Sequence, residues 1–495
     1  MLFNSVSFLI FLSLVLLFYF IIPGKWRSGW LLLVSLLFYM SFHPKYLVVI
    51  AFVTAVSYFA ALWAEKEKEN EKRKKMLITA GVFTAAAVLV LFKYTEFILD
   101  NLNRVLGLVH VGEISNPFSF VMPVGVSYFT FQVISYMVDV YKGKIATEKN
   151  FVVYALYVSF FPKIISGPIE RGEHFLPQIH NCKNFKLWDG TRVFEGIVIM
   201  ALGYFQKMVV ADRLAIFTGE VFKNYTILGS VELFVAAAAF YIQLYTDFAG
   251  CINIAAGAAK IMGFTLTENF NAPFFSGSIR EYWSRWHISL SNWLRDYIYI
   301  PLGGNRKGTA KKYRNLILTF LVSGLWHGAN WQYVLWGAIH GCYQVAGYLC
   351  APVVERINEK FHTKTESFSY RMLRIVKCWL LVCLAYVFFK VPTAMDGLRY
   401  LGRMFTRWNP WALFDGSLYT YGLSEKYFHF VCIAVIFVLL VDYLKYKKEI
   451  TLDVWLNSQC IWFRWAVLML MIVAIVVCGA YGAAYEAENF IYFQF

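Results

Sequence analysis

The chain has 495 residues, of which 59% are hydrophobic, 19% are aromatic and only 16% are charged. This composition excludes an ordinary soluble domain, in which about 25% of residues are charged. The formal net charge is +15, but the basic residues fall in short loops between apolar runs, so we expect no nucleic-acid partner. An all-α, multi-pass integral membrane protein in contact with lipid is predicted.

The first apolar run, residues 6–22, is long enough to cross a hydrocarbon core of about 30 Å. No basic segment precedes it and no small-residue cleavage site follows it, so we interpret it as a retained transmembrane helix. Runs at 28–42, 46–63 and 76–98 predict further spans, and residues 1–116 should form a helical scaffold. Run lengths and loop charges predict roughly ten to twelve spans in one membrane domain.

The basic loops predict the orientation of the chain in the membrane. Residues 65–75, 305–314 and 445–448 are rich in lysine and arginine, so the positive-inside rule places them in the cytosol and the N-terminus outside. The longest polar stretch beyond these loops, residues 392–427, should then be extracellular. It interrupts the C-terminal helices expected over 351–495.

The middle of the chain, residues 117–350, differs from a series of regular spans. Residues 117–141 contain Gln132 and Asp139, and residues 160–178 hold three prolines and four charges between apolar pieces. Polar groups and broken helices at membrane depth are tolerated only where they face protein or a water-filled cavity. We therefore expect a core of broken or re-entrant helices around a central cavity.

Metal and disulfide chemistry is not expected. The segment HFLPQIHNC, residues 174–182, matches no standard zinc spacing, and the nine cysteines are scattered without a CxxC pair. We predict no metal, free buried thiols and no permanently bound cofactor.

Residues 279–308 read IREYWSRWHISLSNWLRDYIYIPLGGNRKG. As one continuous helix, this segment would have an aromatic face and an opposite polar face, with His287 at the edge of the aromatic face. The aromatic face would contain Trp283, Trp286, Leu290, Trp293 and Tyr297, and the polar face Glu281, Arg285, Asn292 and Asp296. Pro301 should end the helix, and Gly303 and Gly304 should form a turn. The pattern fits an interfacial amphipathic helix as well as a group of polar residues around a reactive histidine.

Residues 323–340, SGLWHGANWQYVLWGAIH, place two histidines in an apolar run. A histidine there has either a structural or a functional role, because an unpaired polar group in a membrane segment is costly. Gly324 and Gly328 around His327 would admit a second backbone or a thin ligand, and Asn330 adds a polar group. We favour proton transfer for His327 and a structural role for His340.

The apolar run 315–350 is about twice the length of one crossing. It should therefore form a helical hairpin or two broken segments, with residues 328–330 at the bend. His327 would lie beside that bend, and we expect a pocket or tunnel to reach it from the cytosolic side near Arg306 and Lys307. A second opening should face outside.

Several motifs occur in an order that is typical of one family. They are FFPKIISGPIERGEHFLPQ (160–178), KMVVADRLA (207–215), YTDFAG (245–250), WHISLSNWLRDYIYIPLGGNRKG (286–308), SGLWHGANW (323–331) and the C-terminal FIYFQF (490–495). With these motifs the chain resembles the membrane-bound O-acyltransferase (MBOAT) family. More narrowly, it is similar to the bacterial membrane subunit that O-acetylates alginate and other polysaccharides.

The resemblance implies roles for particular residues. His327 matches the invariant histidine that acts as the base, and His287 matches a second histidine of the pattern. Arg171 and Asp212 match charged positions on which this branch depends. Asp247, in the YTDFAG motif, and Asn330 are expected to support the site.

The resemblance also implies the reaction and its partners. An acetyl group would pass from cytosolic acetyl-CoA across the bacterial inner membrane for O-acetylation of an extracellular polysaccharide. An extracytoplasmic partner of the SGNH-hydrolase-like acetyltransferase type would complete the transfer. Transfer of D-alanine to teichoic acid is the alternative within the family.

Elementary chemistry agrees with acyl transfer, because a histidine can take the proton of a hydroxyl that attacks a thioester. The basic residues of the 305–314 loop, Arg306, Lys307, Lys311 and Lys312, suit coenzyme A phosphates, although the positive-inside rule alone also explains them. A multi-span transporter or polysaccharide export component is the alternative of another class. A transporter should show repeated broken helices and paired intramembrane charges, whereas here the polar groups concentrate in one unrepeated core.

Overall fold

The computed structural model describes residues 1–67, 69–110, 112–116, 121–186 and 188–481. Regular structure in these residues is helical, and the one β-type pairing recorded among them is an antiparallel bridge between Phe270 and Trp286. The C-terminal FIYFQF motif and residues 117–120 lie outside the described residues. The prediction of an all-α protein is confirmed.

The chain divides into two compact units. One contains residues 1–197 and 255–267, and the other contains residues 198–254 and 268–495. This division differs from the one expected into scaffold, core and C-terminal parts, which was drawn from the regularity of the apolar runs. Two long helices, α10 (Gly190–Tyr204) and α12 (Ser230–Met262), instead contribute residues to both units.

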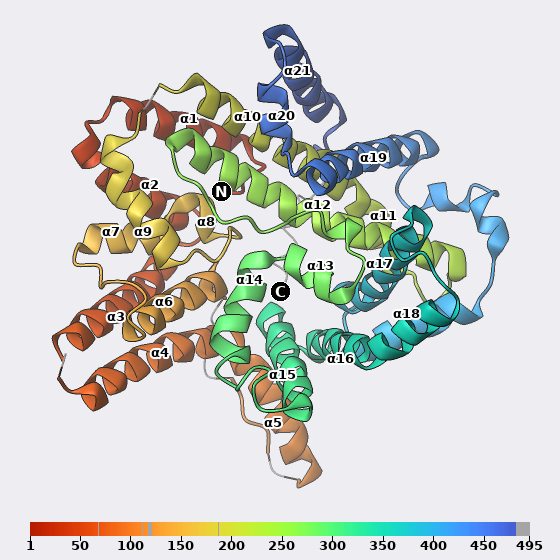
Figure 1. Ribbon diagram of the computed structural model, residues 1–495, viewed down its shortest axis with the longest axis horizontal. Helices are drawn as coiled ribbons and strands as arrows, with labels where there is room; N and C mark the ends of the chain where they lie inside the picture. The colour runs from red at the N-terminus through yellow and green to blue at the C-terminus, as the bar shows by residue number, and fades with distance from the viewer. Residues whose placement is uncertain (68, 111, 117–120, 187, 482–495) are drawn as a thin grey trace. The chain divides into compact units, whose positions relative to one another are not determined.

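The first unit is built from helices of very different length. They are α1 (Val6–Ile21), α2 (Arg27–Met40), α3 (Leu47–Lys66), α4 (Glu71–Lys93), α5 (Thr95–Leu108), α6 (Val126–Tyr141), α7 (Phe151–Ser159), α8 (Phe161–Ile164) and α9 (Gly172–Asn181), with the short turns η1 (Gly24–Trp26), η2 (Pro44–Tyr46) and η3 (Cys182–Asn184). Figure 1 shows α3, α4 and α6 side by side. A Cβ atom on Gly81 of α4 would lie 2.8 Å from both Ala60 Cβ in α3 and Met137 Sδ in α6, so the glycine permits this close packing.

The second unit carries the segments with the predicted histidines. Its helices are α11 (Asp212–Lys223), α13 (Ile279–Arg285), α14 (Ile288–Leu294), α15 (Thr309–His327), α16 (Trp331–Lys360), α17 (Phe368–Lys390), α18 (Ala394–Thr406), α19 (Glu425–Lys448), α20 (Leu452–Asn457) and α21 (Ile461–Cys478). Two π-helical stretches, η4 (Phe205–Ala211) and η6 (Arg295–Tyr299), and three short turns, η5 (Pro273–Phe275), η7 (Pro410–Leu413) and η8 (Ser417–Thr420), complete it.

Seven helices of the described chain are long and apolar enough to cross a membrane. They are Pro44–Lys66, Glu71–Lys93, Gly190–Lys223, Ser230–Met262, Phe368–Lys390, Glu425–Lys448 and Ile461–Cys478. The sequence predicted roughly ten to twelve spans, because it also included apolar runs that form shorter helices. Examples are α1 with 16 residues and α2 with 14 residues.

The expected single helix from residue 279 onward is wrong. The chain forms α13 and α14 with a break between them, where Trp286 is extended and His287 has a φ of 45°. A left-handed backbone costs a non-glycine residue about 1–2 kcal/mol, so the surrounding structure must hold it in place. The aromatic residues counted along one helix therefore do not form one continuous face. The glycine turn is confirmed, since Gly303 and Gly304 have φ values of 107° and 54°.

The expected hairpin is confirmed. Helix α15 ends at His327, α16 begins at Trp331, and residues 328–330 connect them. A Cβ atom on Gly324 would lie 2.2 Å from the backbone oxygen of Tyr333, and one on Gly328 would lie 2.2 Å from the Tyr333 ring. The two glycines therefore allow close approach of α16, so a second helix and not a ligand lies against them.

Candidate active site

The two histidines predicted to be catalytic lie near each other in the second unit. His287 is 0% exposed and His327 is 3% exposed, and their ring centroids are 6.3 Å apart. This separation is too long for a direct hydrogen bond between ring nitrogens. The ring of Trp326 lies against both, with centroids 5.7 Å from His287 and 5.0 Å from His327.

Aromatic rings surround His327 at the end of α15. Trp336 of α16 and Phe389 of α17 pack edge-on against its imidazole, with centroids at 5.1 and 5.2 Å. These rings reduce contact with water, and a dry site strengthens each hydrogen bond or charge interaction that forms in it. We refer to His287, Trp326, His327, Trp336 and His340 as the histidine–tryptophan cluster.

His340, for which a structural role is expected, also belongs to this cluster. It is fully buried, accepts a hydrogen bond at Nδ1 from Trp283 Nε1 over 3.2 Å, and lies 4.7 Å from the Trp336 ring centroid. A structural role agrees with the Trp283 bond. The Trp336 ring also packs against His327, so it lies between His340 and the proposed base.

His287 has a polar neighbour that sequence analysis missed. Asn269 is 1% exposed, and its Oδ1 lies 3.3 Å from His287 Nδ1. The same oxygen accepts hydrogen bonds from the backbone N–H of Ser289 at 3.0 Å and from its hydroxyl at 2.9 Å. Eighteen residues separate Asn269 from His287, and no local periodicity links them.

Several buried polar atoms of this region have no hydrogen-bond partner among the described residues. They are Asn269 Nδ2, Ser323 Oγ, Gln332 Oε1, Trp336 Nε1 and His340 Nε2. Buried polar atoms are rarely left without partners in proteins, and such exceptions concentrate where ligands or water bind.

Two of the expected supporting carboxylates share one cation. Lys207 Nζ lies 2.7 Å from Asp212 Oδ1 and 2.6 Å from Asp247 Oδ1, and all three side chains are at most 6% exposed. Lys207 lies in the π-helix η4, a distortion that is frequent at functional sites. Phe248, which follows Asp247 in α12, packs on the His287 ring with centroids 4.9 Å apart.

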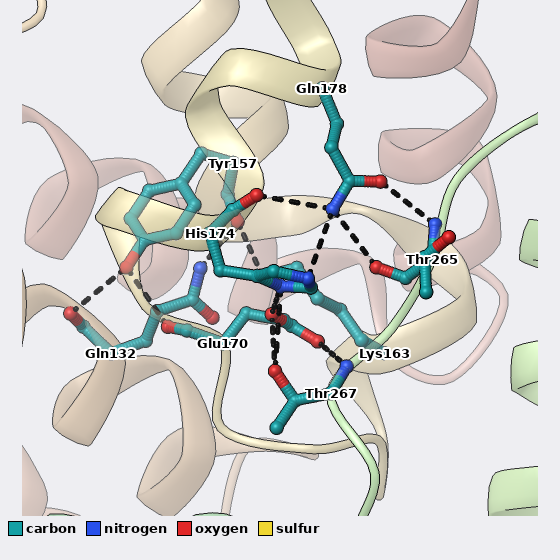
Figure 2. Close-up of polar contacts among 8 residues, drawn as sticks. All are labelled: Gln132, Tyr157, Lys163, Glu170, His174, Gln178, Thr265 and Thr267. Carbon is teal, nitrogen blue, oxygen red and sulfur yellow. Dashed lines mark hydrogen bonds and ion pairs between the residues drawn. The ribbon is translucent and has the colours of Figure 1, made fainter.

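Arg171 lies in the first unit, half-buried and directly before α9. The preceding residue, Glu170, is fully buried and accepts hydrogen bonds from Thr267 N at 2.5 Å, Thr267 Oγ1 at 2.9 Å and His174 Nδ1 at 2.8 Å. Figure 2 shows this network.

A neighbouring set of contacts holds Lys163, a second charge of the broken segment 160–178. Lys163 is 2% exposed and donates to the Tyr157 backbone oxygen at 2.5 Å, an oxygen that also accepts from Gln132 Nε2 (Figure 2). The Tyr157 hydroxyl donates to the Glu170 backbone oxygen at 3.0 Å. These contacts join α6, α7 and the residues just before α9, so Lys163 and Glu170 have structural partners.

The residues expected to bind the acyl donor lie at the surface. Arg306, Lys307 and Lys311 are exposed, whereas Lys312 is half-buried with its ammonium 3.3 Å from the Tyr348 ring centroid. The loop has a buried anchor, because Asn315 donates to the backbone oxygens of Leu302 at 3.2 Å and Gly304 at 3.0 Å.

Asn330, which was expected to support the site, contacts the start of a helix instead. It is exposed, and its Oδ1 accepts the N–H of Trp331 at 2.7 Å, which caps the start of α16.

Comparison with known proteins places these residues in a family context. The family model described as MBOAT, membrane-bound O-acyltransferase family, matches residues 18–389. The chain is 36% identical to the protein named "Probable alginate O-acetylase AlgI" of Azotobacter vinelandii, over 84% of this chain and 80% of that protein. It is 33% identical to the peptidoglycan O-acetyltransferase of Helicobacter pylori, over 82% of this chain and 80% of that protein.

A more distant relative is the teichoic acid D-alanyltransferase of Bacillus subtilis, 28% identical over 55% of this chain and 70% of that protein. The relatives are bacterial, and the seven spanning helices agree with a multi-pass protein of the inner membrane. His287 and His327 both fall inside the matched region. The chain belongs to the membrane-bound O-acyltransferase family and is an acyltransferase enzyme.

Proposed function

We propose that the enzyme takes an acetyl group from acetyl-CoA in the cytosol and passes it across the membrane for O-acetylation of an extracellular or cell-wall polysaccharide. The names of the relatives support the acceptor class, since alginate and peptidoglycan are both polysaccharides outside the membrane. The observation that carries the proposal is the buried pair His287 and His327, held 6.3 Å apart in an aromatic enclosure.

In this proposal His327 is the general base. An acceptor hydroxyl oxygen attacks the thioester carbonyl carbon while the imidazole of His327 takes the hydroxyl proton. The tetrahedral intermediate then expels the coenzyme A thiolate, the C–S bond breaks, and the thiolate takes the proton from the imidazolium. Products are the acetyl ester and coenzyme A with a free thiol.

Polar atoms near His327 support such a transition state. Trp336 Nε1 is buried without a hydrogen-bond partner among the described residues, so it is a donor available to an oxyanion. The aromatic rings around His327 would also protect the thioester from hydrolysis by water.

We further propose that the donor enters at the basic loop. The exposed side chains of Arg306, Lys307 and Lys311 would contact the phosphates of coenzyme A, and a pocket or tunnel would lead from there to His327. On the outer side, an SGNH-hydrolase-like acetyltransferase partner would deliver the acetyl group to the polymer.

The test uses the purified protein in lipid nanodiscs with acetyl-CoA carrying a radiolabelled acetyl group. The proposal expects release of free coenzyme A that requires an acceptor or the partner, with little release when a D-alanyl thioester replaces acetyl-CoA. Turnover of the D-alanyl thioester alone would instead identify the enzyme as a D-alanyl transferase.

A further inference from the structure

We propose that Asn269 is a positioning residue for the acyl transfer: its side-chain amide holds His287 in the tautomer that is protonated on Nδ1, which leaves Nε2 as the nitrogen that accepts a hydrogen bond beside the base His327. This inference rests on the proposed function, because it concerns the second histidine of the same site. It assigns a role to a residue that no sequence motif singled out.

The hydrogen bonds fix the orientation of the amide. The backbone N–H of Ser289 approaches the amide oxygen at 3.0 Å, and a backbone N–H can only donate. The atom that it meets must therefore be the oxygen, and the Ser289 hydroxyl donates to the same atom at 2.9 Å. The identity of Oδ1 thus follows from its partners.

The oxygen in turn fixes the imidazole. His287 Nδ1 lies 3.3 Å from Asn269 Oδ1, and a carbonyl oxygen only accepts hydrogen bonds. Nδ1 must carry the proton for this contact to be a bond, so the neutral ring has its lone pair on Nε2. Catalytic histidines in general need such a partner to select the useful tautomer.

The backbone places Asn269 opposite His287. Phe270 and Trp286 form the antiparallel bridge, Asn271 N donates to Arg285 O at 2.9 Å, and Ile288 N donates to Asn269 O at 3.0 Å. These bonds flank His287, whose φ of 45° is the unusual conformation at the break between α13 and α14. A conformation of this kind persists only where surrounding contacts determine it, and it is typical of functional sites.

A simpler role for Asn269 is also visible. Ser289 is the second residue of α14, and its N–H needs an acceptor outside the helix, so Asn269 caps α14. Loss of the cap would damage folding in Asn269→Ala whichever role is correct. The test therefore requires a substitution that keeps the cap and changes only the effect on His287.

Asn269→Asp meets this requirement. A carboxylate still accepts from Ser289 and His287, and Asn269 Nδ2 has no hydrogen-bond partner among the described residues, so its exchange for oxygen breaks no recorded bond. A negative charge beside the ring stabilises the imidazolium. The rings that pack on His287 belong to Phe248, Trp326 and His327. Of these three side chains, that of His327 is the titratable one.

The measurement is the pH profile of kcat/KM for acetyl transfer in nanodiscs. For Asn269→Asp we expect the acidic limb to move to higher pH by about one unit or more. Asn269→Ala should lower kcat by about 100-fold with little change in KM, because the ring is no longer held. Ser289→Ala, which leaves the Asn269–His287 contact intact, should keep the wild-type profile. An Asn269→Asp protein that folds and has the wild-type profile would overturn the proposal and leave only the cap.

A second measurement is independent of activity. In the full-length protein labelled with ¹⁵N-histidine, the resonance that disappears in His287→Gln belongs to His287, and its nitrogen shifts report the tautomer. We expect protonation on Nδ1, and protonation on Nε2 would overturn the proposal. Because this readout needs no turnover, it separates a failure of the Asn269 assignment from a failure of the proposed acetyl transfer.

Discussion

Among single residues, Lys207 is one whose loss should clearly destabilise the second unit. Its ammonium lies within 2.7 Å of two buried carboxylates, Asp212 and Asp247. Lys207→Met would leave these like charges close together, and removing one partner of a buried ion pair costs about 3–5 kcal/mol. We expect a clearly lower melting temperature in detergent.

The double variant Lys207→Met with Asp247→Asn is the matched control. It removes a negative charge along with the positive one, so it should recover part of the lost melting temperature. A single Lys207→Met variant as stable as the wild type would contradict the ion-pair interpretation.

Sequence analysis identified His327 because an isolated histidine between glycines in an apolar run needs an explanation. Asp212 and Asp247 were instead singled out by the family motifs in which they lie. Neither kind of evidence identified Lys207 as the partner of Asp247 or Asn269 as the partner of His287, because these residues are far apart in the sequence. Polar residues with long-range partners give no periodic signal.

At the level of elements, the α15–α16 hairpin depends on glycine where the helices touch. A Cβ atom at position 324 would meet the Tyr333 backbone oxygen at 2.2 Å, which a rigid backbone cannot relieve. Gly324→Ala should therefore destabilise the protein by about 1–3 kcal/mol and disturb His327, which lies one turn further along α15. Thermal unfolding and acyl transfer would both measure this.

Gly347→Ala in α16 is the control for that prediction. Nothing lies within 4 Å of a Cβ atom there, so alanine should be neutral or stabilise the helix by up to about 1 kcal/mol. Equal behaviour of the two variants would contradict the close packing of α15 on α16.

The two histidine segments show what a period of 3.6 residues can and cannot predict. The hairpin was predicted from run length and not from this period, because residues 315–350 are about twice as long as one crossing. The 3.6-residue period failed at the break between α13 and α14, because the extended Trp286 and left-handed His287 are held by bonds to residues 269–271. Tertiary hydrogen bonds override a helical pattern that is locally consistent.

The start of α9 should respond to pH. The hydrogen bond to the buried carboxylate of Glu170 raises the pKa of His174 above its ordinary value. The protonated histidine then contributes stability that is fully present below about pH 6.5 and is lost as the pH rises through the higher folded pKa. We expect the stability difference between the wild type and His174→Gln to shrink over that range.

Thr267→Val serves as the control, because it removes the hydroxyl contacts to Glu170 and His174 without removing a titrating group. It should lower stability similarly at every pH in the same range. If His174→Gln had the same pH dependence of unfolding as the wild type, the His174–Glu170 bond would not be the cause.

For the whole molecule, composition was enough to predict a helical membrane protein, and ordered motifs were enough to predict the family. The two compact units were not predictable, because each combines segments that are far apart in the sequence. Counting apolar runs also does not separate full spans from shorter helices, since the 16-residue α1 is as apolar as a full span.

Orientation in the membrane follows from the charged loops and has a direct test. Thr309→Cys and Asp415→Cys introduce exposed thiols in a background without the exposed Cys342, Cys350, Cys432 and Cys460. The positive-inside rule predicts that an impermeant thiol reagent labels position 309 from the cytosol and position 415 from outside. Labelling of both from one face would contradict the topology.

The central claim, that His327 is the base of a membrane acyltransferase, is tested most directly by acetyl transfer in His327→Ala. The variant should reach wild-type levels in the membrane and lose at least about 100-fold of its transfer rate, with a substantial loss in His287→Ala and a milder one in His340→Ala. The exposed His429, changed to alanine, should leave the rate unchanged. A well-folded His327→Ala protein that keeps a rate near that of the wild type would contradict the account.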